Sequence, residues 1–391
     1  MNFELISVIV FLLVLAILIY KDRKNIEFKS GLIIKKSTKG KKFIYDFAAK
    51  HEKTLKTIGI IGIAISVFAS MYGVYLLLNS TYNIFTKKAS DSALKVVLPS
   101  VEGVKMPGFI LGVPFWYWII SVFVVMLAHE PMHALMARAE KVQIKSFGLL
   151  LFIILPGAFV EPNEKQLKRK NTISKLRIFA GGSFANLIVA GILFLLILGL
   201  SKLLSIFLVP SGVNYESLIE GSYAEKVGLT GVIIRINEQE IKTIEDLSKV
   251  MQNIKPGEKI IVETTTSVYE IQTIEDHETG RALIGIKNPY IEYTYASFLA
   301  KYGSVSKTTL ITLQWIEGLI YWVFVLNLGV GIFNLFPLKP LDGGLMLEAV
   351  CEHFFKEKGK KISNLISVLV LVLVLFNIFG PQIIKTIYSI I

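Results

Sequence analysis

Residues 109–137 read FILGVPFWYWIISVFVVMLAHEPMHALMA, an apolar run that carries the pattern HExxH near its end. About 20 apolar helical residues cross a hydrocarbon layer of about 30 Å, so the run predicts a transmembrane helix. On such a helix His129 and His133 are four residues apart and share one face, where two imidazoles can bind one metal ion. Glu130 follows the first histidine and is placed to act as the general base of a zinc hydrolase.

The HExxH pattern has a second interpretation, a polar helix end that faces the interior of a helix bundle. Charged side chains at membrane depth are costly and are retained mainly where they are paired or functional, which favours the metal site. The chain has a single cysteine, Cys351, so an internal disulfide and a cysteine-based zinc site are excluded. Metal ligands must therefore be histidine, aspartate or glutamate.

The composition is that of a polytopic membrane protein. Hydrophobic residues make up 53% of the 391 residues and the mean hydropathy is +0.59, more apolar surface than a soluble chain can bury. The net charge of +12 could indicate nucleic-acid binding, but lysine and arginine are dense in three segments, 21–56, 165–177 and 356–361. Such clusters are typical of cytoplasmic loops, so we expect a lipid bilayer and no nucleic acid as partner.

Six apolar stretches are long enough to cross the membrane: residues 3–20, 57–78, 109–137, 178–209, 311–336 and 362–379. If they alternate in direction, the three basic segments fall on one side, which the positive-inside rule makes the cytoplasm. Both termini and the long segment 210–308 then lie outside, and the first stretch is expected to be an uncleaved anchor. His129 would lie about 21 Å along its helix, towards the cytoplasmic side of the cell membrane.

Residues 147–160, FGLLLFIILPGAFV, are apolar but too short to cross the bilayer. Pro156 and Gly157 supply a turn signal, so one interpretation is a re-entrant hairpin that lies against protein or a watery cavity. A short interfacial helix is an equally good interpretation of the sequence alone.

Residues 213–286 change to short alternating apolar runs separated by turns, a pattern typical of strands. Strands are expected at 231–237 and 259–263, with a helix at 244–252 between them. The stretch SYAEKVGL at 222–229, followed by GVIIRIN, resembles the SPAxxAGLxxGDxIxxING signature of bacterial-type PDZ domains. The resemblance implies an α+β domain whose sheet edge accepts an extended peptide. The alternative is a small β-rich domain that only blocks access by its bulk.

A catalytic zinc usually takes three protein ligands and leaves one position for water or substrate, so one more ligand is required. Three candidates lie near membrane depth on the same predicted side, Glu161, His353 and Asp342. Asp342 belongs to NLFPLKPLDGG at 334–344, where two prolines end one helix and two glycines open a turn into the next. A carboxylate on irregular backbone at the membrane edge normally lines a cavity. Its alternative role is the N-cap of the helix predicted at 343–353.

Three ordered motifs resemble the site-2 protease family of intramembrane zinc metalloproteases. They are the HExxH in an apolar helix, AGGSFAN at 180–186, which is similar to the family's AGPxxN, and the NxxPxxPLDGG at 334–344. The resemblance covers nearly all of the chain after about residue 107 and implies one zinc ion per chain. The site residues that it implies are the zinc ligands His129, His133 and Asp342, the catalytic Glu130, and Asn334 and Asn186 beside the substrate.

We therefore expect a polytopic α-helical membrane protein with about six transmembrane helices, a re-entrant hairpin and an inserted extracytoplasmic PDZ-like α+β domain. Residues 1–107 would be a transmembrane pair with a basic cytoplasmic segment. Residues 108–209 would be the first part of the catalytic membrane domain, and 210–294 the PDZ-like domain. Residues 295–391 would complete the catalytic domain with LDGG and the last helix.

The resemblance implies an intramembrane zinc metalloendopeptidase that cuts transmembrane segments of other membrane proteins in regulated intramembrane proteolysis. A catalytically silent scaffold that binds partners through the PDZ-like domain is the alternative, and the intact Glu130 argues against it. A transporter with intramembrane metal ligands is disfavoured, because HExxH supplies a base that transport does not need.

Overall fold

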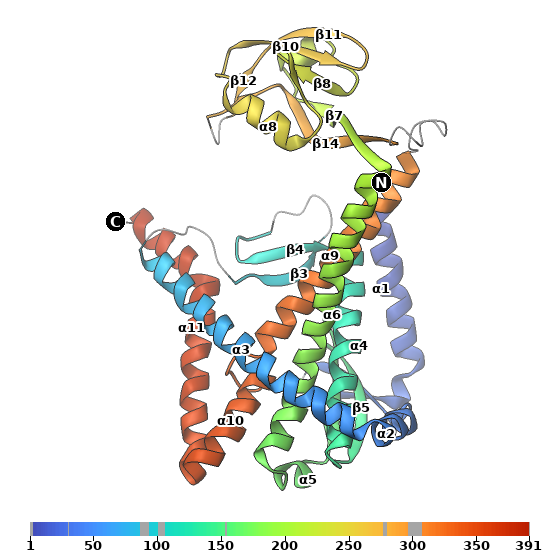
Figure 1. Cartoon of the computed structure of the whole chain (residues 1–391), viewed down its shortest axis with the longest axis vertical. Coiled ribbons are helices and arrows are strands. Elements are labelled where there is room, and N and C mark those ends of the chain that lie inside the picture. The colour runs from blue at the N-terminus through green and yellow to red at the C-terminus, as the bar shows by residue number, and fades with distance from the viewer. Residues whose placement is uncertain are drawn as a thin grey trace. The chain divides into compact units, whose positions relative to one another are not determined.

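The computed structural model describes residues 3–29, 31–86, 94–100, 106–152, 155–276, 280–295 and 307–390. The chain divides into two compact units, Leu198–Trp315 and the remainder, Met1–Ile197 with Ile316–Ile391. Within the described residues, six helices are long and apolar enough to cross a membrane, which confirms the polytopic class. Figure 1 shows that the first unit is mainly helical, whereas the second is rich in strands.

Four of these spans lie entirely in the first unit, and the spans in α6 and α9 belong partly to the first unit and partly to the second. The predicted start of the third span at residue 109 is wrong, because Ile110–Pro114 form a strand and the helix begins only after Pro114. The helices are α1 (Phe3–Lys21), α2 (Lys41–Lys50), α3 (Glu52–Phe85), α4 (Phe115–Ala139), α5 (Glu164–Lys168), α6 (Thr172–Phe207), α9 (Lys307–Asn334), α10 (Asp342–Phe355) and α11 (Gly359–Ile390), with the 3-10 turns η1 (Arg23–Asn25) and η3 (Lys356–Lys358).

A four-stranded antiparallel sheet in the order β1-β2-β5-β6 belongs to the first unit. Residues 147–152 lie in β5 and residues 155–160 lie in β6, and the two strands pair, so the alternative of a short interfacial helix is wrong. Pro156 and Gly157 are not the turn but lie inside β6, opposite Leu151 and Leu150. Whether the hairpin enters the membrane stays a prediction. The strands are β1 (Ile26–Lys29), β2 (Leu32–Ser37), β5 (Ile144–Phe152) and β6 (Leu155–Pro162), while β3 (Val96–Ser100) and β4 (Ile110–Pro114) form a separate parallel pair.

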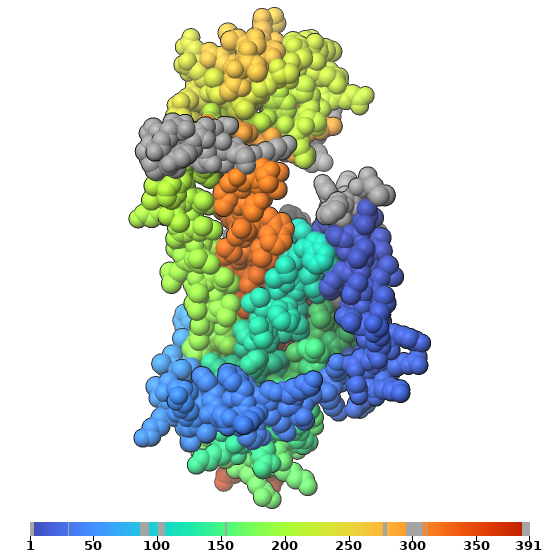
Figure 2. Space-filling view, turned by 90° about the vertical axis from the view of Figure 1, so that its right-hand side faces the viewer, coloured from blue at the N-terminus to red at the C-terminus, as the bar shows by residue number. Residues whose placement is uncertain are grey.

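The first helix packs loosely on the rest of the first unit. α1 lies beside α4 (Figure 2), where Trp116 Nε1 donates a hydrogen bond to Ser7 Oγ at 2.9 Å. A cavity of about 640 Å³ separates parts of α1, α4 and the β5–β6 hairpin, and its lining is almost entirely apolar, for example Leu15, Phe123 and Leu150. An apolar lining of this kind is compatible with a lipid environment.

The three basic segments meet at one end of the first unit. α2 packs against the end of α4 in a cluster that includes Ala48 and Met136. Lys175, near the start of α6, lies 3.5 Å from Glu352 at the end of α10, and Figure 1 shows α2, α5 and the end of α10 at this same end. The gathering agrees with the predicted topology, while the orientation of this end towards the cytoplasm stays a prediction.

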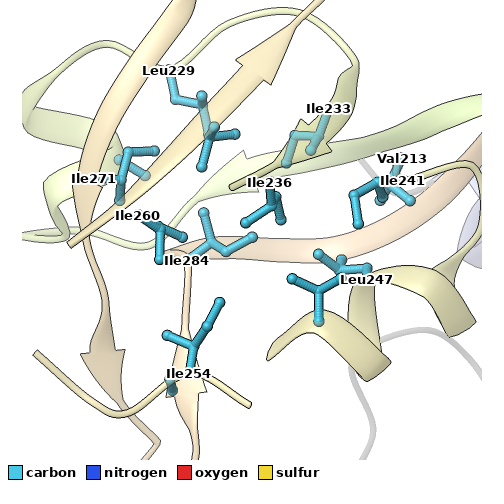
Figure 3. Close-up of a cluster of buried hydrophobic side chains, with 14 residues drawn as sticks. Val213, Leu229, Ile233, Ile236, Ile241, Leu247, Ile254, Ile260, Ile271 and Ile284 are labelled. Carbon is cyan, nitrogen blue, oxygen red and sulfur yellow. The ribbon is translucent and has the colours of Figure 1, made fainter. Parts of the chain in front are cut away.

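The second unit is a small α+β domain with its own core. Its main strands pair in the order β11-β10-β8-β7-β14. The core includes buried aliphatic side chains from every one of these strands except β14, for example Val213, Ile233, Ile260 and Ile271 (Figure 3), together with side chains of α7, α8 and the connecting loops. The elements are β7 (Leu208–Leu218), α7 (Tyr223–Lys226), β8 (Ile233–Ile236), β9 (Gln239–Glu240), α8 (Ile244–Gln252), β10 (Lys259–Thr264), β11 (Val268–Gln272), β12 (Ile274–Glu275), β13 (Ala282–Leu283) and β14 (Ile286–Tyr295).

The predicted helix at 244–252 coincides with α8, and the predicted strands correspond to β8 and β10. α8 begins with a capping box, in which Thr243 Oγ1 accepts from the Asp246 amide and the Asp246 carboxylate accepts from the Thr243 amide. The hydroxyl and the backbone amide of Thr243, both close to the Asp246 carboxylate, lower the pKa of Asp246. A groove of about 330 Å³ lies beside α8. Its lining includes Leu247 and Met251 of α8 and Ile286 at the start of β14, which is an edge strand of the sheet.

Candidate metal centre

α4 carries both histidines of the HExxH pattern on one face. His129 Nε2 and His133 Nε2 are 3.1 Å apart, as expected for side chains separated by one helical turn. α4 remains one helix through Pro131, although proline lacks the amide that would bond the carbonyl of Leu127. The two imidazoles therefore converge from one continuous helix.

α10 brings the third candidate ligand to the two imidazoles. Asp342 Oδ2 lies 3.4 Å from His129 Nε2, and Asp342 Oδ1 lies 3.3 Å from His133 Nε2. Ligands about 2.0–2.2 Å from a zinc ion at tetrahedral angles would be separated by about 3.3–3.6 Å. Ligand atoms of all three residues lie within 4.8 Å of one another. Two imidazoles and a carboxylate at this spacing fit a zinc ion.

The turn before α10 fixes the position of Asp342. α9 ends at Asn334, and Leu341 is the N-cap of α10, without a side-chain hydrogen bond to the helix. A Cβ atom on Gly343 would lie 2.0 Å from the carbonyl oxygen of Leu335. The turn therefore packs so closely against the start of α10 that only glycine fits at this position. Asp342 is thus the first helical residue and faces the histidines, and its alternative role as N-cap is wrong.

α6 contacts all three candidate ligands through one short stretch, residues 178–186. Outer partners of this kind orient metal ligands and decide which ring nitrogen of a histidine is free to bind. The contacts are a hydrogen bond from His133 Nδ1 to the carbonyl oxygen of Ile178 at 2.7 Å, one from Ser183 Oγ to Asp342 Oδ2 at 2.6 Å, and one between the Asn186 side-chain amide and His129 Nδ1 at 3.1 Å.

Gly182 allows α6 to approach the imidazoles this closely. A Cβ atom on Gly182 would lie 2.3 Å from His133 Nε2 and 2.8 Å from His129 Cδ2, distances that non-bonded atoms do not tolerate. Any larger side chain would therefore enter the space between α6 and the two rings. This space is a second feature, beside the donor set, that fits a bound metal ion.

Glu130 lies beside these residues and contacts the β5–β6 hairpin. Its side chain is partly buried, and its carboxylate lies near the backbone amide of Val160 in β6. β6 is the end strand of its sheet among the described strands. The candidate general base is thus next to the end strand of this sheet.

The other residues predicted near the site have different surroundings. Glu161 accepts hydrogen bonds from Ser146 and Lys145, which hold its pKa below the usual value, and His353 is exposed near the far end of α10. Neither belongs to the group that could hold a metal. Asn334 is the last residue of α9 and is partly buried.

The sequence alone does not predict the contacts made by Ile178, Ser183 and Val160. Two of the three contacts use backbone atoms, for which the residue type carries no signal. The run AGGS at 180–183 is the one indication, because small residues inside an apolar helix mark a close approach between helices.

Comparison with known proteins agrees with this geometry. Residues 117–375 match the family model described as Peptidase family M50. The chain belongs to peptidase family M50, the site-2 protease family. This M50 protein is 22% identical over 308 residues to a Clostridium acetobutylicum protein named "Putative zinc metalloprotease", with 63% of this chain and 88% of the relative covered. It is 28% identical over 373 residues to an uncharacterized protein of Methanocaldococcus jannaschii, with 93% and 91% covered.

The family, the apolar helices and the site together define the class of enzyme. The M50 protein is a membrane metalloprotease with zinc as its cofactor. Its His-His-Asp group is compatible with a zinc site.

Proposed function

We propose that this M50 protease hydrolyses peptide bonds within transmembrane segments of other membrane proteins, in regulated intramembrane proteolysis. The observation that carries the proposal is the location of the candidate centre. Both histidines lie in α4, and Asp342 begins the apolar stretch Asp342–Ile384. Both segments are long and apolar enough to cross a membrane. Substrates held in the same bilayer would have the most direct access to such a centre.

His129, His133 and Asp342 are proposed to hold one zinc ion per chain. When bound, zinc supplies Lewis-acid activation of water and of the scissile carbonyl group. Glu130 is proposed to accept a proton from the attacking water and to deliver it to the leaving amine. Its position supports this role, because Glu130 directly follows His129 on α4 and its carboxylate lies near β6.

The outer edge of β6 is proposed to receive the substrate. A helical segment hides its carbonyl groups in internal hydrogen bonds, so it must unwind locally before it can be cut. An extended segment can add to a sheet edge through backbone hydrogen bonds, and β6 offers such an edge next to Glu130. Asn334, at the end of α9 just before the turn to Asp342, is proposed to contact the substrate.

The domain at 210–294 is proposed to be PDZ-like and extracytoplasmic, with the metal centre towards the cytoplasm. The element order supports the PDZ-like assignment, since a short helix precedes β8 and a longer helix precedes β10. The groove between α8 and the neighbourhood of β14 supports peptide binding, because it lies next to a sheet edge. A silent scaffold that uses only this domain would have no need of the converging His129, His133 and Asp342.

Removing the Asp342 carboxylate should release the metal. We expect about one zinc ion per purified wild-type chain, and for Asp342→Ala a zinc affinity lower by about 100-fold or more, because a ligand is deleted. The matched control is Asp46→Ala, which removes an exposed aspartate of α2 and should keep wild-type zinc content. Metal analysis after dialysis against a chelator gives the answer, and full zinc occupancy in Asp342→Ala would refute the proposed ligand set.

A further inference from the structure

Asn186 contacts a metal-ligand candidate from a fully buried position. Its exposed fraction is 0%, and its side-chain nitrogen lies 3.1 Å from His129 Nδ1. Its other amide atom, Oδ1, has no hydrogen-bond partner among the described residues. A buried polar atom without a partner is costly, and the contact with His129 is the one hydrogen bond that holds this amide among the described residues.

The second histidine shows which partner a ligating imidazole requires. His133 Nδ1 faces the carbonyl oxygen of Ile178 at 2.7 Å. A carbonyl oxygen only accepts, so Nδ1 must carry the proton, and His133 Nε2 is left with a lone pair directed at Asp342 and His129. The neutral ring is thus fixed in the form that binds a metal through Nε2.

His129 needs the same arrangement, and Asn186 is the residue placed to provide it. An amide nitrogen that donates to Nδ1 would force the proton onto Nε2, which then could not bind a metal. The oxygen and nitrogen of an asparagine side chain exchange places by a half-turn of the amide, and shape alone does not distinguish the two orientations. With the oxygen turned towards His129, Nδ1 donates and Nε2 keeps its lone pair.

We infer that Asn186 is a positioning residue for His129: its side-chain oxygen accepts the Nδ1 proton and keeps Nε2 free to bind zinc. The inference rests on the proposed zinc site. It replaces the predicted contact of Asn186 with substrate, because a side chain that is fully buried against a ligand has no surface for a substrate.

Three variants of the full-length protein test this role. Asn186→Leu keeps the approximate shape but removes the acceptor, and Asn186→Asp keeps an acceptor oxygen. The matched control is Asn327→Leu on α9, since Asn327 is also 0% exposed with an unpartnered Oδ1, but its amide bonds the Val323 carbonyl of its own helix. The readouts are the zinc dissociation constant from competition with a chelator, and KM for a model transmembrane substrate.

We expect Asn186→Leu to weaken zinc binding by about 10- to 100-fold, with Asn186→Asp and Asn327→Leu within a few-fold of wild type. Equal zinc affinity in Asn186→Leu and wild type would overturn the inference, and so would an equal loss in the leucine and aspartate variants. A raised KM with unchanged zinc affinity would also overturn the inference, because it would show that Asn186 contacts the substrate. Failure of the wild-type protein to bind zinc would instead overturn the proposed metal site itself.

Discussion

Glu130→Gln is expected to abolish peptide hydrolysis while zinc stays bound. Glutamine has nearly the same shape and can still accept hydrogen bonds, but it cannot take a proton from water. Loss of a general base typically lowers kcat by about 10²- to 10⁴-fold. Zinc content and kcat should be measured on the same preparation, so that loss of metal and loss of the base are separated.

A matched control for Glu130 lies on the same stretch of chain. Glu140, just after α4, is 7% exposed and accepts hydrogen bonds from Arg177 at 2.7 Å and from Ser174 at 2.5 Å. Glu140→Gln weakens this buried ion pair and should lower thermal stability, without changing kcat per zinc-loaded molecule. Near wild-type hydrolysis by Glu130→Gln would show that Glu130 is not the general base.

Gly182→Ala is expected to destroy the metal centre. The added methyl group would lie 2.3 Å from His133 Nε2 and 2.8 Å from His129 Cδ2, so both imidazoles or α6 must move. Displacing catalytic groups by about 1 Å can lower the rate by about 100-fold, and here the same displacement also separates the zinc ligands. We expect loss of most bound zinc together with a fall in activity of at least about 100-fold.

Gly191→Ala provides the comparison on the same helix. Among the described residues, no heavy atom outside the neighbouring backbone of α6 would lie within 4 Å of a Cβ at this position. Alanine favours a helix over glycine by about 1 kcal/mol, so this variant should be as active as wild type and no less stable. If Gly182→Ala bound zinc and turned over substrate like Gly191→Ala, the close approach of α6 to the imidazoles would be wrong.

The sequence predicted those features that depend on local spacing. The pairing of His129 with His133 follows from helical periodicity, and the spans follow from apolar stretches of about 20 residues. The helix at 244–252 was predictable because Thr243 and the residues after it form a capping signal. Each of these signals is carried by residues that are neighbours in the chain.

Features that depend on long-range pairing were not predictable in this way. β2 pairs with β5, for example Leu32 with Phe152, and nothing in the basic segment 21–56 identifies a partner so far along the chain. The contacts of α6 with the candidate ligands join residues from three helices. Two of these contacts are made by the side chains of Ser183 and Asn186, and serine and asparagine occur in many other structural roles. Asn186 illustrates the difference, because its motif suggested the substrate whereas its position puts it against His129.

The position of the cut in a transmembrane substrate tests the central claim most directly. Wild-type protein in lipid vesicles with zinc would be incubated with a set of single-pass membrane proteins, and the products identified by mass. We predict cleavage inside the apolar segment, lost when zinc is removed with a chelator and restored when zinc is returned. Cleavage confined to the parts of the substrates outside the membrane, or cleavage inside the segment that persists without zinc, would contradict the account.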